Sequence, residues 1–141
     1  MFKKIFKKEK KENSGNKKIL VAALLIHAAK VDENYSDIEK KIIKEALINL
    51  NNINSDQAED LMKLAEKKEE ESNQMLEFTR EIKKHPMEFR LKIIEIIWKI
   101  VYSDDVSDNY ESNLIRRICG LLYISDKDNG IIRTKVKNLS K

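Results

Sequence analysis

Apolar residues recur every three or four positions over most of this chain, which is the spacing that places side chains on one face of an α-helix. One example is the run of Ile38, Ile42, Ala46 and Leu50. Along the whole sequence, the pattern predicts seven helices, at residues 18–31, 37–51, 56–70, 73–84, 86–102, 109–122 and 126–138. Only three Gly and one Pro are present, too few for the many turns of an all-β fold, so we expect helices joined by short polar connectors.

Two of the predicted helices, 18–31 and 86–102, are apolar around most of their circumference, as central helices of a bundle are. The polar residues of the second helix, Lys92, Glu95 and Lys99, fall on one narrow stripe. A chain of 141 residues is enough for one domain with one core. We therefore predict an all-α, single-domain bundle of about seven helices around two buried central helices.

An acidic segment follows each of the two buried helices. VDENYSDIEKKII covers residues 31–43, and SDDVSDNYESNLI covers residues 103–115. Each segment holds an Asp seven residues before a Glu, namely Asp32 before Glu39 and Asp104 before Glu111. Because an apolar helix precedes and an amphipathic helix follows in both cases, the sequence predicts two related helix-loop-helix hairpins.

The acidic segments have two interpretations, and the first is helix capping. Ser36 and Glu39 have the spacing of a capping box, in which the serine oxygen accepts a hydrogen bond from a backbone amide and the glutamate reaches back to the cap. Asp108 and Glu111 repeat this spacing in the second segment. Acidic residues also suit the positive end of the helix dipole, so capping alone accounts for their presence.

The second interpretation is a divalent-cation site, because calcium and magnesium prefer oxygen ligands. The candidate ligands are Asp32, Asn34, Ser36 and Glu39 in the first segment and Asp104, Asp105, Asp108 and Glu111 in the second. In an EF-hand the bidentate Glu follows the first Asp by eleven positions, with a glycine at the sharp turn. Here the separation is seven and no glycine is present, so one segment is too short to wrap an ion, but two packed side by side could share one.

The net charge of +4 is unevenly distributed. Residues 1–18 contain eight Lys and two Glu, a net of +6, so the remaining residues carry +4 − 6 = −2. The basicity belongs to the N-terminus, which argues against nucleic acid as a partner of the folded part. We expect a basic leader at residues 1–17 and a helical domain at residues 18–141.

The basic leader has the pattern of a helix that lies on a membrane surface, with apolar residues on one face and lysines opposite. The residues expected to contact an anionic membrane are Phe2, Lys3, Lys4, Ile5, Phe6, Lys7 and Lys8. The alternative is a disordered solubilising tail. Because no signal peptide and no apolar run of membrane-spanning length is found, we expect a cytoplasmic protein, peripheral to the inner membrane if the leader binds lipid.

Other candidate chemistry is sparse. No nucleophile is paired with a base and no glycine-rich phosphate loop occurs, so we expect no enzyme activity. His27 and Cys119 lie in apolar helical runs and are expected in the core, Cys119 as an inert thiol. Arg116 and Arg117 are expected to pair with carboxylates of the second acidic segment or to contact an anion or a partner. The stretch EKKEEE at residues 66–71 is expected to be a solvated helix end.

The sequence resembles the TerB-like family, an all-helical module of bacterial tellurite-resistance proteins and of a membrane-anchored DnaJ-like co-chaperone. The resemblance covers most of residues 19–138, and its most specific part is YSDDVSDNYESNLIRRICGLLYISDKD at residues 102–128. It implies a seven-helix bundle, no catalytic activity, and a metal-binding acidic site formed here by Asp32, Glu39, Asp104 and Glu111. Glu33 and Asp105 stand where the family carries glycine.

Two functions are compatible with these observations. The first is a non-catalytic adaptor in a bacterial stress response, with protein partners, a bound calcium or magnesium ion and a membrane contact through the leader. The alternative is a purely structural interaction domain whose acidic segments are helix caps without a metal.

Overall fold

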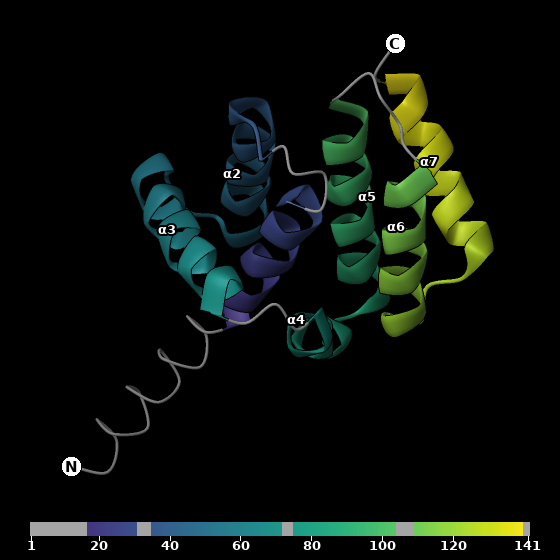
Figure 1. The fold of residues 1–141 in the computed structure, drawn as a ribbon, viewed down its shortest axis with the longest axis horizontal. Helices are drawn as coiled ribbons and strands as arrows, with labels where there is room; N and C mark the ends of the chain where they lie inside the picture. Colours follow the sequence, from purple (N-terminus) through teal and green to yellow (C-terminus); the bar gives the residue numbers. More distant parts are fainter. Residues whose placement is uncertain (1–16, 31–34, 72–74, 104–108, 140–141) are drawn as a thin grey trace.

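The computed structural model describes residues 17–30, 35–71, 75–103 and 109–139, and the backbone alone at 109–112. Every regular element in these ranges is a helix, and the helices are residues 17–30, α2 (Asp37–Asn51), α3 (Ser55–Glu71), α4 (Met75–Lys83), α5 (Met87–Ser103), α6 (Asn109–Leu121) and α7 (Asp126–Leu139) (Figure 1). Each end lies within two residues of its predicted position. The prediction of an all-α bundle is confirmed.

The two most apolar helices form the centre of the bundle, as predicted. Residues 21–26 of the 17–30 helix are all buried, and α5 buries seven large side chains that include Trp98. α5 packs against α2, α4, α6 and α7, while α3 packs on α2 (Figure 1). None of the described helices is long and apolar enough to cross a membrane. One hydrophobic cluster includes residues from the 17–30 helix through α7.

Side-chain caps fix where the helices begin. Ser125 Oγ accepts a hydrogen bond from Asp128 N at 3.1 Å and caps α7, whose predicted start followed Ser125. α3 begins with a reciprocal pair: Asn54 Oδ1 accepts from Gln57 N at 2.8 Å, and Gln57 Oε1 accepts from Asn54 N at 3.0 Å. This capping box of Asn54 and Gln57 was not predicted, because Asn and Gln replace the more familiar Ser and Glu.

One arginine joins two helix ends at the base of the bundle. Arg90 of α5 donates from Nε to the carbonyl of His85 at 3.1 Å and from Nη1 to the carbonyl of Leu122 at 2.8 Å. His85 follows α4 and Leu122 follows α6, so both acceptors are carbonyls that a helix end leaves without a helical partner. The planar guanidinium can serve both because its donors point in fixed directions.

Candidate functional site

The polar cluster that includes Tyr35 lies where the chain enters α2. Lys30 ends the 17–30 helix, and its Nζ binds Glu69 Oε2 of α3 at 2.8 Å. On the other side of segment 31–34, the Tyr35 hydroxyl donates to Glu66 Oε1 of α3 at 2.9 Å. Glu66 and Glu69 are three residues apart and share one face of that helix. α3 therefore contacts the chain on both sides of residues 31–34.

Glu69 is more buried than Glu66, although the sequence predicted a solvated stretch at residues 66–71. Only 5% of Glu69 is exposed, because it continues the inward stripe of Ala58, Met62 and Ala65. Its carboxylate accepts from Lys30 and lies 3.3 Å from His27 Nδ1. The lysine charge offsets the cost of burying the carboxylate. The prediction of a solvated helix end is wrong at this position.

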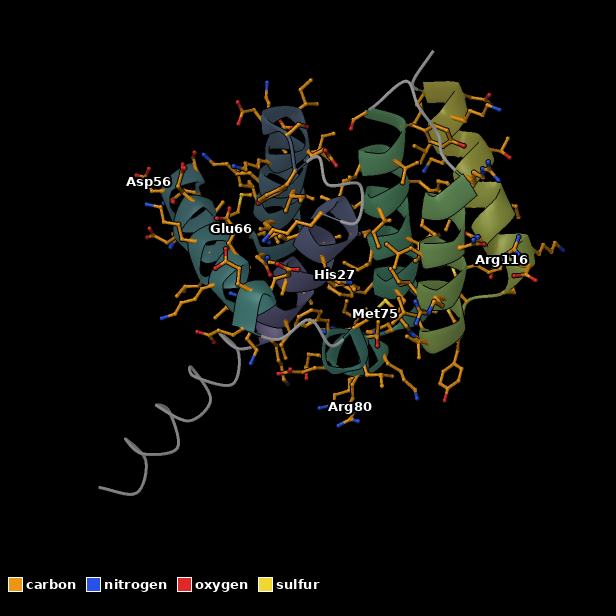
Figure 2. The ribbon with its side chains drawn as sticks, viewed as in Figure 1. His27, Asp56, Glu66, Met75, Arg80 and Arg116 are labelled. Atoms are coloured by element: carbon orange, nitrogen blue, oxygen red, sulfur yellow. The ribbon has the colours of Figure 1, made fainter. Side chains whose placement is uncertain are left out.

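His27 is also less buried than predicted. Its side chain retains 19% of its exposure and lies at the edge of the core, 6.4 Å between ring centroids from Phe78. Figure 2 shows His27 on the 17–30 helix and Glu66 on the neighbouring α3. The hydrogen-bonding side of the ring faces Glu69, which explains why a histidine is tolerated within an otherwise apolar helix.

Tyr35 is surrounded by negative charge. Burial is the main reason that its pKa is raised above 10, and the hydrogen bond to Glu66 and the charges of Glu66, Glu69 and Glu39 raise it further. The phenol therefore remains protonated and acts as a donor. Two cations balance part of this charge: Lys40 Nζ lies 4.8 Å from the ring centroid of Tyr35, and Lys30 Nζ lies 5.9 Å from it.

Glu39 completes the predicted capping box of α2. Ser36 Oγ accepts from Glu39 N at 3.2 Å, and Glu39 Oε1 accepts from Ser36 N at 3.3 Å and from Ser36 Oγ at 3.1 Å. The Glu39 residue is 1% exposed. The capping prediction is thus confirmed for the first acidic segment.

The family model for tellurite resistance protein TerB matches residues 18–134. The chain belongs to the TerB family. The match starts in the 17–30 helix and reaches into α7, so it includes both acidic segments. No curated protein and no solved structure gives a significant match to the chain.

Most of the predicted ligands of the TerB domain fall outside the described residues. These are Asp32, Asn34, Asp104, Asp105, Asp108 and the side chain of Glu111. The membrane-contact residues Phe2 to Lys8 lie outside them as well. In the part of the chain that is described, no group of three or more His, Cys, Asp or Glu side chains is arranged to hold a metal ion. The carboxylates around Tyr35 therefore contribute negative charge next to the first acidic segment and are not a ligand set by themselves.

The remaining candidates lie on α6 of the TerB domain. Arg116 and Arg117 are exposed (Arg116 is labelled in Figure 2), and their predicted partners lie outside the described residues. Cys119 is buried, as predicted, with 2% exposed. Burial, with a smaller contribution from the charge of Asp126, raises the pKa of its thiol to about 11. The thiolate that would be nucleophilic is therefore scarce at neutral pH.

Proposed function

We propose that this TerB-family chain is a non-catalytic binding module that takes up a divalent cation at its acidic segments and serves as an adaptor in a bacterial stress response of the tellurite-resistance type. The observation that carries the proposal is the concentration of the carboxylates of Glu39, Glu66 and Glu69 around Tyr35, within the first acidic segment. Such a field favours the approach of a cation. The residues that would hold calcium or magnesium are Asp32, Glu39, Asp104, Asp108 and Glu111.

The state of the reactive side chains favours binding over catalysis. Cys119 is buried with a raised pKa, Tyr35 keeps its proton, and His27 is hydrogen-bonded to a carboxylate that also pairs with a lysine. Tyr35 and His27 thus have structural partners, and Cys119 is enclosed in the core. We therefore propose that the module recruits rather than transforms its partners.

Titration calorimetry with calcium, magnesium, manganese and zinc tests the cation proposal. The wild type is expected to release or absorb heat with at least one ion, and that ion should raise its melting temperature. The double variant Asp32→Ala/Asp104→Ala should lose both effects. Asp56→Ala/Asp60→Ala, which removes two exposed carboxylates of α3, should retain them. Absence of heat and of thermal stabilisation at millimolar ion would refute the proposal.

A second function is favoured by the complete capping box at Ser36 and Glu39. In this alternative, the TerB domain is a structural interaction module whose acidic segments only cap helices. Glu39→Gln separates the two functions, because glutamine can still complete the box but brings no charge. Weaker ion binding with unchanged stability would support the cation site. Unchanged behaviour of the variant towards every ion would support the alternative.

We further propose that the leader attaches the module reversibly to the cytoplasmic face of the inner membrane. The support is the sequence pattern of residues 1–12, in which each lysine near an anionic surface contributes about 1 kcal/mol. Co-sedimentation with vesicles of phosphatidylglycerol and phosphatidylethanolamine, with and without residues 1–12, tests this. The truncated chain should remain in the supernatant. Equal partitioning of both chains would eliminate the membrane role.

A further inference from the structure

A groove runs between α2 and α5, with a volume of about 440 Å³. Its apolar lining comes from Ile42, Ala46 and Leu50 of α2 and from Ile96 of α5. The three α2 residues follow one another at four-residue intervals, so they form a stripe about 12 Å long. Ala46 is in the middle of this stripe, where its small side chain leaves room for an incoming group.

The α5 wall of the groove carries the polar stripe noted in the sequence. Lys92 and Lys99 are exposed, and neither makes an ion pair with another described residue. Glu95 lies between them, but its Oε1 is 3.1 Å from Lys135 Nζ of α7, which neutralises it. The opposite wall contributes the exposed Glu45. Two exposed lysines on one wall and one exposed glutamate on the other therefore border an apolar floor.

The spacing of Lys92 and Lys99 indicates which kind of partner would fit the groove. Lys92 and Lys99 are seven residues apart on one helix, which is about 10 Å along its axis. Two acidic residues seven positions apart on a second helix have the same separation. A helix that lies along α5 could place these acids against the lysines while its apolar face covers Ala46 and its neighbours.

We propose that the α2–α5 groove binds an amphipathic helix of a partner protein, with two acidic residues seven positions apart that face Lys92 and Lys99. The leader of this chain is a poor occupant, because residues 1–16 carry six Lys and two Glu and would be repelled. The inference rests on the proposed role as a binding module and specifies the partner class. It does not require a bound cation.

The experiment uses the full chain and two synthetic helical peptides with the same leucine stripe. One peptide carries glutamates at the two facing positions, and the other carries lysines. Binding is followed by fluorescence anisotropy and by amide chemical shifts. The acidic peptide should bind the wild type and shift the signals of Ile42, Ala46 and Ile96. The lysine peptide should bind at least about tenfold more weakly.

Charge reversal in the protein provides the matched test. Lys92→Glu/Lys99→Glu should weaken the acidic peptide about tenfold and strengthen the lysine peptide, whereas Lys127→Glu/Lys137→Glu on α7 should change neither. Ala46→Phe should block both peptides while circular dichroism confirms that the fold is retained. Asp32→Ala, which tests the cation site, should leave peptide binding unchanged, so the two proposals can fail separately.

Several outcomes would overturn the inference. These are no binding of the acidic peptide at millimolar concentration, equal binding by the charge-reversed protein, and signal shifts confined to other helices. Decanoate is added as a further probe, because a groove with lysines could instead suit a small anionic amphiphile. If decanoate shifts the groove signals and the acidic peptide does not, the proposed helical partner is wrong.

Discussion

Individual residues of the first hairpin show how charge is placed inside this bundle. Glu69 is buried by the helical period of α3, and Lys30 and His27 meet it from the 17–30 helix. Glu39 is buried by the cap that it completes. Capping could be predicted because it depends on residues three positions apart. The Glu69 pair could not, because its partners are 39 and 42 positions away and depend on how the helices pack.

The buried ion pair predicts a specific loss of stability. Glu69→Gln removes the negative charge next to Lys30 while keeping the side-chain shape. We expect the free energy of unfolding to fall by about 1–2 kcal/mol, less than for a fully buried pair because Lys30 is partly exposed. Urea unfolding measures the effect. Glu70→Gln, at an exposed position of the same helix, should change stability by less than about 0.5 kcal/mol. Equal effects of the two substitutions would contradict this account.

Tyr35 predicts an alkaline dependence of stability. Folding raises the pKa of its hydroxyl above the ordinary 10, so the folded state holds this proton more tightly than the unfolded state. The contribution is complete below pH 10 and declines as the pH rises above it. Urea unfolding at about pH 9 and about pH 11 should therefore show a smaller loss for Tyr35→Phe than for the wild type. A loss of the same size in both proteins would exclude Tyr35 as the cause.

At the scale of whole helices, α7 is attached to the core partly through polar contacts. α7 buries only Val136 completely, yet it packs against the central helix α5. Polar contacts align it: Trp98 Nε1 donates to Asn129 Oδ1 at 2.9 Å, and the Arg133 guanidinium lies 5.0 Å from the Trp98 ring centroid. The sequence predicted the range of α7 from its apolar spacing. It could not show which α5 residue Asn129 contacts, because that depends on the rotation of two helices about their axes.

Asn129→Ala is expected to loosen α7. The substitution leaves the buried indole N–H of Trp98 without its acceptor, at a cost of about 1–3 kcal/mol. Trp98 is the one tryptophan of the chain, so its fluorescence should shift to longer wavelength as water reaches the ring. Asn138→Ala, at an exposed site on α7, serves as the control and should leave the spectrum unchanged. An unshifted spectrum for Asn129→Ala would show that the hydrogen bond does not hold the helix in place.

The whole molecule consists of a basic leader and a nearly neutral body. Residues 1–17 carry seven Lys and two Glu, a net of +5, so residues 18–141 have a net charge of +4 − 5 = −1. The TerB match begins at residue 18, and the first fully enclosed core residues follow shortly after. Fold class, helix ranges and the two central helices could all be predicted, because each depends on local periodicity. The groove between α2 and α5 could not, since it is formed by two helices far apart in sequence.

This separation predicts that the leader is dispensable for folding. Removal of residues 1–16 should leave the melting temperature of the chain unchanged to within about 2 °C, because every core side chain that the structure describes is kept. Differential scanning calorimetry of the two chains at equal ionic strength measures this. A fall of more than about 5 °C would show that the leader packs on the domain and contributes to its stability.

The attachment of Lys30 and Tyr35 to neighbouring positions of α3 also has a consequence for protein engineering. Because Glu69 contacts Lys30 and Glu66 contacts Tyr35, we expect these two anchor points to keep their positions when the sequence between them is changed. We therefore expect that residues 31–34 can be exchanged for foreign tetrapeptides while the helices on either side keep their places. The domain thus offers a scaffold for displaying short grafted sequences.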